Sequence, residues 1–191
     1  MMLDVDNQAQ AIRMLLFIRH AWHLAEELPL PQLHPAPESG TSAMPRETDP
    51  KLWEQRWRQT WLEAWGAQTQ GSYRAPGTAQ SLAATEHLSE NDFWTAKYGT
   101  AGLDWAAFQQ WEQMFDPAFG LGLDPVLRSP QVHPVLLAAW ERGLRKLTVV
   151  PWAGFCVHRL SDSHLVTSFD TAASRPLLTR ALAEWLRTPL E

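Results

Sequence analysis

The chain has 191 residues, of which 45% are hydrophobic and 19% are charged, with a single cysteine, Cys156. These values lie near globular averages and exclude a disordered or fibrous chain. The formal net charge of −5 gives no electrostatic attraction to nucleic acid or to anionic lipids. One cysteine cannot form an intrachain disulfide, which favours a reducing cytoplasm. We therefore expect a soluble, cytoplasmic protein with one domain, residues 1–191, and with neither nucleic acid nor a membrane among its partners.

Residues 7–28 are predicted to form an amphipathic helix, because apolar residues recur on one side of it at helical spacing. On this helix His20, His23 and Glu27 would fall within about 60° of one another, which suits zinc or another divalent metal. The same residues lie on the polar side that faces water, and HxxH does not match the HExxH pattern. The metal site is therefore an alternative interpretation, and no cofactor is predicted.

Residues 29–50 contain six prolines, which disfavour helix at themselves and at the preceding residue. We expect a long, extended connection here. Connections of this length are uncommon inside compact domains and are often lids or binding loops. The segment is therefore interpreted as a loop or lid that can move.

Trp53, Trp57, Trp61 and Trp65 follow one another at a spacing of four residues. In a helix capped by Thr48 or Asp49, they would form one stripe about 120° wide and about 18 Å long. Two interpretations are open. The stripe packs in the core of its own domain, or part of it binds a second copy, a protein partner or a planar ligand. Glu54 and Arg58 are expected to form a surface ion pair.

Further helices are predicted at residues 79–88, 92–97, 105–115 and 132–145, with a closing helix that begins after Ser174. Residues 147–170 are rich in β-branched and aromatic residues and are predicted to form an antiparallel β-meander of about three strands. A three-residue turn at 161–163 would place Cys156 opposite Ser168 and His158 opposite Val166. The expected fold is therefore α+β: a mostly helical domain, a small C-terminal meander and a closing helix.

Cys156 and His158 alternate with apolar neighbours and would share one face of a strand, which suggests a nucleophile and its base. Neighbours on one face of a strand lie nearly 7 Å apart, which is beyond hydrogen-bond reach. A buried, inert cysteine is the preferred interpretation. The chain has no GxSxG, GxxxxGK[ST], GxGxxG or paired CxxC motif, so the catalytic residues, if any, stay unknown.

Two functional hypotheses follow. The first is a non-enzymatic interaction module that acts through a homo-oligomer or a protein partner, with these candidate binding residues: Trp53, Trp57, Trp61, Trp65, Trp105 and Trp111. The second is a protein that binds a small apolar or aromatic ligand, or a metal-dependent hydrolase, with a pocket between the tryptophan helix and the meander. Its candidate site residues are His20, His23, Glu27, His158 and His164.

Overall fold

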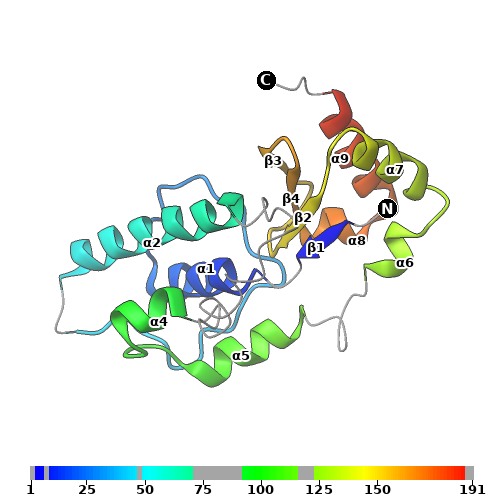
Figure 1. Ribbon diagram of the computed structural model, residues 1–191. Coiled ribbons are helices and arrows are strands. Elements are labelled where there is room, and N and C mark those ends of the chain that lie inside the picture. Colours follow the sequence, from blue (N-terminus) through cyan, green and yellow to red (C-terminus); the bar gives the residue numbers. More distant parts are fainter. Residues whose placement is uncertain (1–2, 7–8, 47–48, 71–91, 116–122, 188–191) are drawn as a thin grey trace, which may run out of the picture. The chain divides into compact units, whose positions relative to one another are not determined.

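The computed structural model describes residues 3–6, 9–46, 49–70, 92–115 and 123–187 (Figure 1). The predicted helix at 79–88 lies outside the described residues. The chain divides into two compact units. The helical unit comprises Gln10–Pro29 and Glu38–Gln110, and the sheet unit comprises Met1–Ala9, Leu30–Pro37 and Trp111–Glu191. No helix within the described part is both long and apolar enough to cross a membrane.

The helices that begin in the helical unit are α1 (Gln10–Trp22), α2 (Pro50–Gln70), α4 (Asp92–Tyr98) and α5 (Trp105–Gln113). Two of them start where an aspartate caps them, as the sequence predicts. Asp49 accepts a 3.0 Å hydrogen bond from the Lys51 amide ahead of α2, and Asp104 accepts a 3.1 Å bond from the Ala107 amide ahead of α5. The predicted starts of the tryptophan helix and of the helix at 105 are therefore confirmed.

The first helix is shorter than predicted, because α1 ends at Trp22 instead of continuing to residue 28. His23 has a positive φ of 55°, and the amide of Leu24 donates a 3.1 Å bond back to the carbonyl of Arg19. This left-handed residue with its backward bond is a common way for a helix to end. No glycine marks the position, so the sequence gives no signal for it.

The described residues of the sheet unit form four strands and four helices. In chain order they are β1 (Asp4–Asp6), α6 (Asp124–Leu127), α7 (His133–Glu141), β2 (Lys146–Val150), β3 (Val157–Ser161), β4 (His164–Ser168), α8 (Phe169–Ala173) and α9 (Arg175–Arg187). The closing helix begins directly after Ser174, whose carbonyl accepts a 2.8 Å bond from the Leu178 amide. The mixed α+β class is therefore confirmed, and β1, α6 and α8 are additions to the predicted elements.

The strands follow the order β1-β2-β4-β3, so the sheet is mixed and the predicted antiparallel meander is only partly right. β3 and β4 form an antiparallel hairpin, whereas β2 pairs in parallel with both β1 and β4. Burial explains this order. β4 is buried along its whole length, whereas β3 carries an exposed His158 and partly exposed neighbours. A meander would put β3 in the centre and leave the more apolar β4 at the edge.

The register of the hairpin agrees with the sequence. His158 lies opposite Val166, and the amide of Ser168 donates a 3.3 Å bond to the carbonyl of Cys156. The register shifts between Arg159 and Ser161, where one extra residue forms a bulge next to the turn. The predicted cross-strand neighbours are therefore confirmed.

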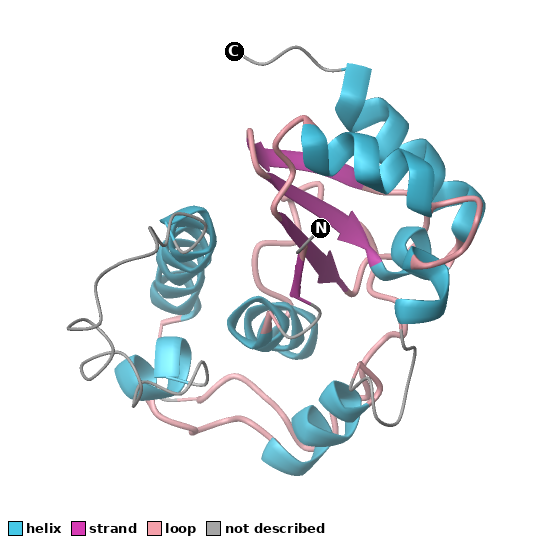
Figure 2. Ribbon diagram, turned by 45° about the vertical axis from the view of Figure 1, so that its right-hand side comes forward, coloured by secondary structure: helices cyan, strands magenta, loops and turns pink. Residues whose placement is uncertain are grey.

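One face of the sheet packs against α7 and α9 (Figure 2). Leu147 and Leu165 lie opposite each other on β2 and β4 and are fully buried. They belong to an apolar cluster with Leu136 of α7 and with Leu182 and Trp185 of α9. This cluster is the core of the sheet unit.

A buried hydroxyl interrupts this core. Thr167 lies two residues after Leu165 and so on the same face of β4, and its Oγ1 has no hydrogen-bond partner among the described residues. A buried hydroxyl without a partner costs stability. We expect Thr167→Val to raise the free energy of unfolding by about 1 kcal/mol in urea denaturation.

Thr148→Val is the matched control, because the Thr148 hydroxyl is also buried but lies 2.8 Å from His164 Nε2. Thr148→Val should lower the free energy of unfolding, because it removes the hydroxyl that contacts His164. Equal losses for the two variants would show that the Thr167 hydroxyl contributes favourably, contrary to the expectation.

Candidate functional site

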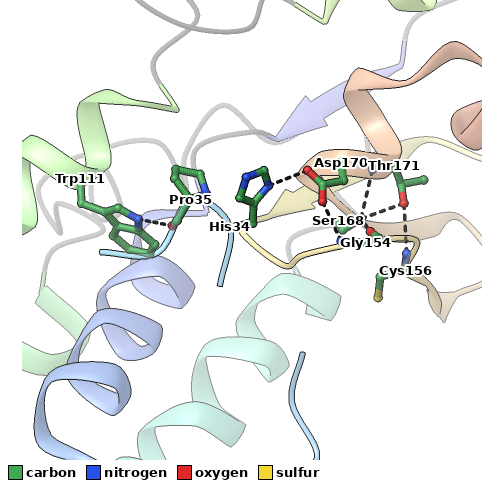
Figure 3. A network of polar contacts seen from close by, with 8 residues as sticks. All are labelled: His34, Pro35, Trp111, Gly154, Cys156, Ser168, Asp170 and Thr171. Carbon is green, nitrogen blue, oxygen red and sulfur yellow. Dashed lines mark hydrogen bonds and ion pairs between the residues drawn. The ribbon is translucent and has the colours of Figure 1, made fainter. Parts of the chain in front are cut away.

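A network of polar contacts in the sheet unit brings together a histidine and an aspartate (Figure 3). His34 Nδ1 lies 2.8 Å from Asp170 Oδ1, and the amide of Gly154 donates a 2.7 Å bond to Asp170 Oδ2. His34 comes from the proline-rich segment, Gly154 from the connection between β2 and β3, and Asp170 from the first turn of α8. No local pattern in the sequence indicates this pair, because its members lie 136 positions apart.

Residues 30–37, here called the strap, are attached along the β2–β3 connection. The contacts that attach them are an isolated bridge between Leu33 and Trp152, and hydrogen bonds from the His34 amide to the Pro151 carbonyl (3.0 Å), from the Ala153 amide to the Gln32 carbonyl (2.8 Å) and from Trp111 Nε1 to the Pro35 carbonyl (2.8 Å). This half of the predicted loop therefore has regular contacts. Whether it moves as a lid stays a prediction.

The electrostatics of the pair favour an aspartate anion. Burial acts to raise the pKa of Asp170, but the Gly154 amide and His34 outweigh it, so the pKa lies below its ordinary value. When the imidazole is neutral, a proton on Nδ1 that faces Asp170 leaves Nε2 as an acceptor. An imidazole oriented in this way has the chemistry of a proton acceptor.

The neighbouring hydroxyls do not supply a nucleophile to that base. Ser168 is fully buried and caps α8, where its Oγ accepts a 3.1 Å bond from the Thr171 amide and donates to the Gly154 carbonyl. The Thr171 hydroxyl lies 2.7 Å from Ser168 Oγ and accepts a 3.0 Å bond from the Cys156 amide. These hydroxyls hold the start of α8 against the β2–β3 connection.

Cys156 is half-buried, and its burial raises the pKa of the thiol. The reactive form of cysteine is the thiolate, so a raised pKa keeps this side chain in its unreactive form at neutral pH. Figure 3 shows the sulfur pointing away from His34 and Asp170. The arrangement agrees with the inert role that the sequence favours, although the side chain is less buried than expected.

The predicted metal ligands do not form a cluster. The helix ends before His23, so His20, His23 and Glu27 do not share a helical face. His23 Nδ1 lies 2.8 Å from Glu26, and Glu27 pairs with Arg58. Within the described part of the chain, no three His, Cys, Asp or Glu side chains are placed to hold a metal ion. The geometric argument for the metal site is therefore lost.

The other two histidines of that hypothesis, His158 and His164, differ in their burial. His164 is fully buried on β4, with Nε2 2.8 Å from Thr148 Oγ1. His158 is exposed on β3. A pocket between α2 and the strands would lie between the two units, and it stays a prediction.

The first half of the tryptophan stripe is core. Trp57 is fully buried, and its Nε1 donates a 2.7 Å bond to the Leu15 carbonyl of α1. Trp53 is buried between Trp22 and Trp94, with ring centroids 5.2 and 5.7 Å away. Core packing, one of the two interpretations of the stripe, therefore describes this half of α2.

The second half of the stripe is partly exposed. The Trp61 ring stacks on that of Trp57 with centroids 5.1 Å apart, and Trp65 meets Trp61 edge to face at 5.6 Å. Trp61 and Trp65 are only partly buried, and Leu62 beside them is 72% exposed. Trp105 is also partly exposed, whereas Trp111 is buried. We call Trp61, Leu62 and Trp65 the aromatic end of α2.

Charges beside the aromatic end are paired within the helical unit. Arg58 lies 2.7 Å from Glu54, as predicted, and it also pairs with Glu27. Glu63 pairs with Lys97 of α4. An apolar centre therefore lies next to a rim of charges that are already neutralised.

Comparisons of the chain with protein-family models, with curated protein sequences and with solved structures found no match. A function for this chain is therefore inferred from the residues described above. Two features stand out: the aromatic end of α2 and the oriented imidazole of His34.

Proposed function

We propose that this protein is a non-enzymatic interaction module that self-associates through the aromatic end of α2. The observation that carries the proposal is the division of the tryptophan stripe. Trp53 and Trp57 are used by the core of the helical unit, whereas Trp61 and Trp65 are partly exposed beside an exposed leucine. Aromatic residues are enriched at the centres of protein interfaces, and a paired polar rim is typical of their edges.

A second copy of the chain is the partner that we favour. Arg58 and Glu63 beside the aromatic end are already paired with Glu54 and Lys97, so two copies can bring these rims together without repulsion between like charges. An interface related by a two-fold axis is the commonest form of association among soluble oligomers. A different protein as partner is the alternative outcome of the test.

The test introduces a charge at the centre of this surface. We expect Leu62→Glu to weaken self-association at least about tenfold, measured as the dissociation constant in sedimentation velocity, because a buried carboxylate at an interface centre would lack a partner. Circular dichroism should show an unchanged helix content, since the Leu62 side chain is 72% exposed in the single chain.

Leu52→Glu is the matched control. Leu52 lies on the same helix, is 39% exposed and is remote from the aromatic end along the chain. It should leave association unchanged. Equal weakening by both variants, or by neither, would contradict the assignment of the interface to the aromatic end.

The His34–Asp170 pair supports a second candidate, a ligand-binding protein or hydrolase in which His34 takes a proton. The exposed imidazole, 59% accessible, is oriented by a carboxylate whose pKa is lowered. A small apolar or aromatic ligand on the tryptophans belongs to the same candidate. The lone cysteine keeps the cytoplasm as the proposed location.

A further inference from the structure

One carboxylate joins three separate segments of the sheet unit. Asp170 contacts His34 of the strap through Oδ1 and the Gly154 amide of the β2–β3 connection through Oδ2 (Figure 3). Asp170 itself belongs to α8. A change in the charge of this carboxylate therefore affects two attachments at once.

The other attachments of the strap do not titrate in the ordinary pH range. They are the backbone bonds of His34 to Pro151 and of Ala153 to Gln32, and the bond from the Trp111 indole to Pro35. Backbone amides and indole neither gain nor lose a proton there. The pair is thus the part of the attachment that responds to pH.

The described segments that contact the pair carry few other ionisable groups. The β2–β3 connection contributes Cys156, whose thiol stays neutral because burial raises its pKa. α8 contributes Asp170 itself, and the neighbouring Ser168 and Thr171 are hydroxyls. Among the described residues, His34 is the ionisable side chain that acts to lower the pKa of Asp170.

We propose that His34 and Asp170 form a proton-operated latch that fastens the strap to the β2–β3 connection, tightest in mild acid and looser on either side. Histidine is the side chain whose charge ordinarily changes near neutral pH, and a hydrogen bond between two charged groups is stronger than one with a neutral imidazole. In stronger acid the carboxylate gains a proton. Because the contacts of Asp170 lower its pKa, the latch is retained below the ordinary aspartate pKa of 3.8 and is lost as the pH falls through the lowered value.

The latch acts on the strap, a segment of the polypeptide that is joined to the helical unit at both of its ends. The chain leaves the helical unit at Pro29, passes through the strap and returns to the helical unit at Glu38. When the latch is closed, the strap is held on the sheet unit. An open latch releases His34 of the strap from Asp170.

The test measures amide hydrogen exchange by NMR at His34 and Ala153, the two amides that join the strap to the connection. Their protection factors should rise about threefold between about pH 8 and pH 5.5, as expected for an exposed ion pair, and fall again below about pH 4. In Asp170→Asn both amides should exchange faster. Their protection factors should then neither rise between about pH 8 and pH 5.5 nor fall below about pH 4. A flat profile in the unaltered protein would overturn the proposal.

Two further variants separate the latch from general loosening. His34→Gln keeps the bond between the Gly154 amide and Asp170. In this variant the protection factors should no longer rise between about pH 8 and pH 5.5 but should still fall below about pH 4. This variant also tests the proposal if Asp170→Asn does not fold. Asp104→Asn is the matched control, because Asp104 holds Thr41 of the same proline-rich segment through bonds of 2.9 and 3.0 Å and has no histidine partner. Asp104→Asn should loosen Thr41 and leave the profile at His34 unchanged. A rise that survives in His34→Gln would also overturn the proposal.

Discussion

Replacement of Trp57 by alanine is expected to lower the free energy of unfolding by about 3 to 5 kcal/mol, a large part of the stability of a domain of this size. Trp57 is fully buried, its Nε1 donates a 2.7 Å bond to the Leu15 carbonyl, and its ring stacks on Trp61. The substitution removes the indole, leaves a cavity between α2 and α1, and leaves a buried carbonyl without that donor. Urea denaturation followed by circular dichroism measures the loss.

Two variants show what the loss consists of. Trp57→Phe keeps much of the apolar volume but removes the donor, so its loss should be smaller than that of Trp57→Ala. Trp61→Ala should cost less than Trp57→Ala, because Trp61 is already partly exposed. If Trp61→Ala were the more destabilising of the two, the division of the stripe into a core half and an exposed half would be wrong.

The second large effect is expected at Gly102, where alanine should lower the free energy of unfolding by about 2 to 5 kcal/mol. Gly102 has a φ of +78°, and a Cβ there would lie 2.3 Å from the Ala43 carbonyl oxygen. The Gly102 carbonyl also accepts bonds of 2.9 Å from the Ala43 amide and 3.1 Å from Trp22 Nε1. Both bonds would be disturbed if the backbone moved away. Thermal unfolding measured by circular dichroism would detect the loss.

Gly99→Ala isolates the steric contribution. Gly99 has a similar φ of +72°, but a Cβ there would meet nothing within 4 Å. Its cost should be about 1 to 2 kcal/mol, from the left-handed backbone alone. Equal costs at the two positions would mean that the close approach of Ala43 to Gly102 does not matter for stability.

Local signals in the sequence predict much of the fold. Asp49 with Pro50 and Asp104 identify helix starts, because a carboxylate cap and an N-terminal proline satisfy the needs of a first turn. The turn expected at 161–163 predicts the register of the hairpin, including His158 opposite Val166. These features depend on residues that are close in the chain.

Features that depend on distant residues could not be predicted in this way. β1 is three residues long and pairs in parallel with β2, about 140 residues later, so no turn links the two strands in sequence. The end of α1 at Trp22 rests on a left-handed His23, where the sequence has no glycine. The pairing of His34 with Asp170 joins a proline-rich segment to a short helix that the sequence analysis did not predict.

The candidate sites show the same division. Helical spacing correctly gave the stripe on α2 and the Glu54–Arg58 pair, but spacing alone does not indicate where burial stops along a helix. Trp53 and Trp57 are buried because the first half of the helix contacts α1 and Trp94, whereas Trp61 and Trp65 are only partly buried. The metal hypothesis relied on a continuous helix through Glu27, and it lost its basis when α1 ended earlier.

The most direct test of the account is native mass spectrometry of the unaltered protein between about 1 μM and about 100 μM, a range that detects dimers of moderate affinity. The account predicts a dimer or larger assembly of the 21.7 kDa chain, with a fraction that increases with concentration. A chain that stays monomeric at every concentration would contradict self-association through the aromatic end of α2. A small-molecule adduct on that monomer would instead favour the ligand-binding candidate.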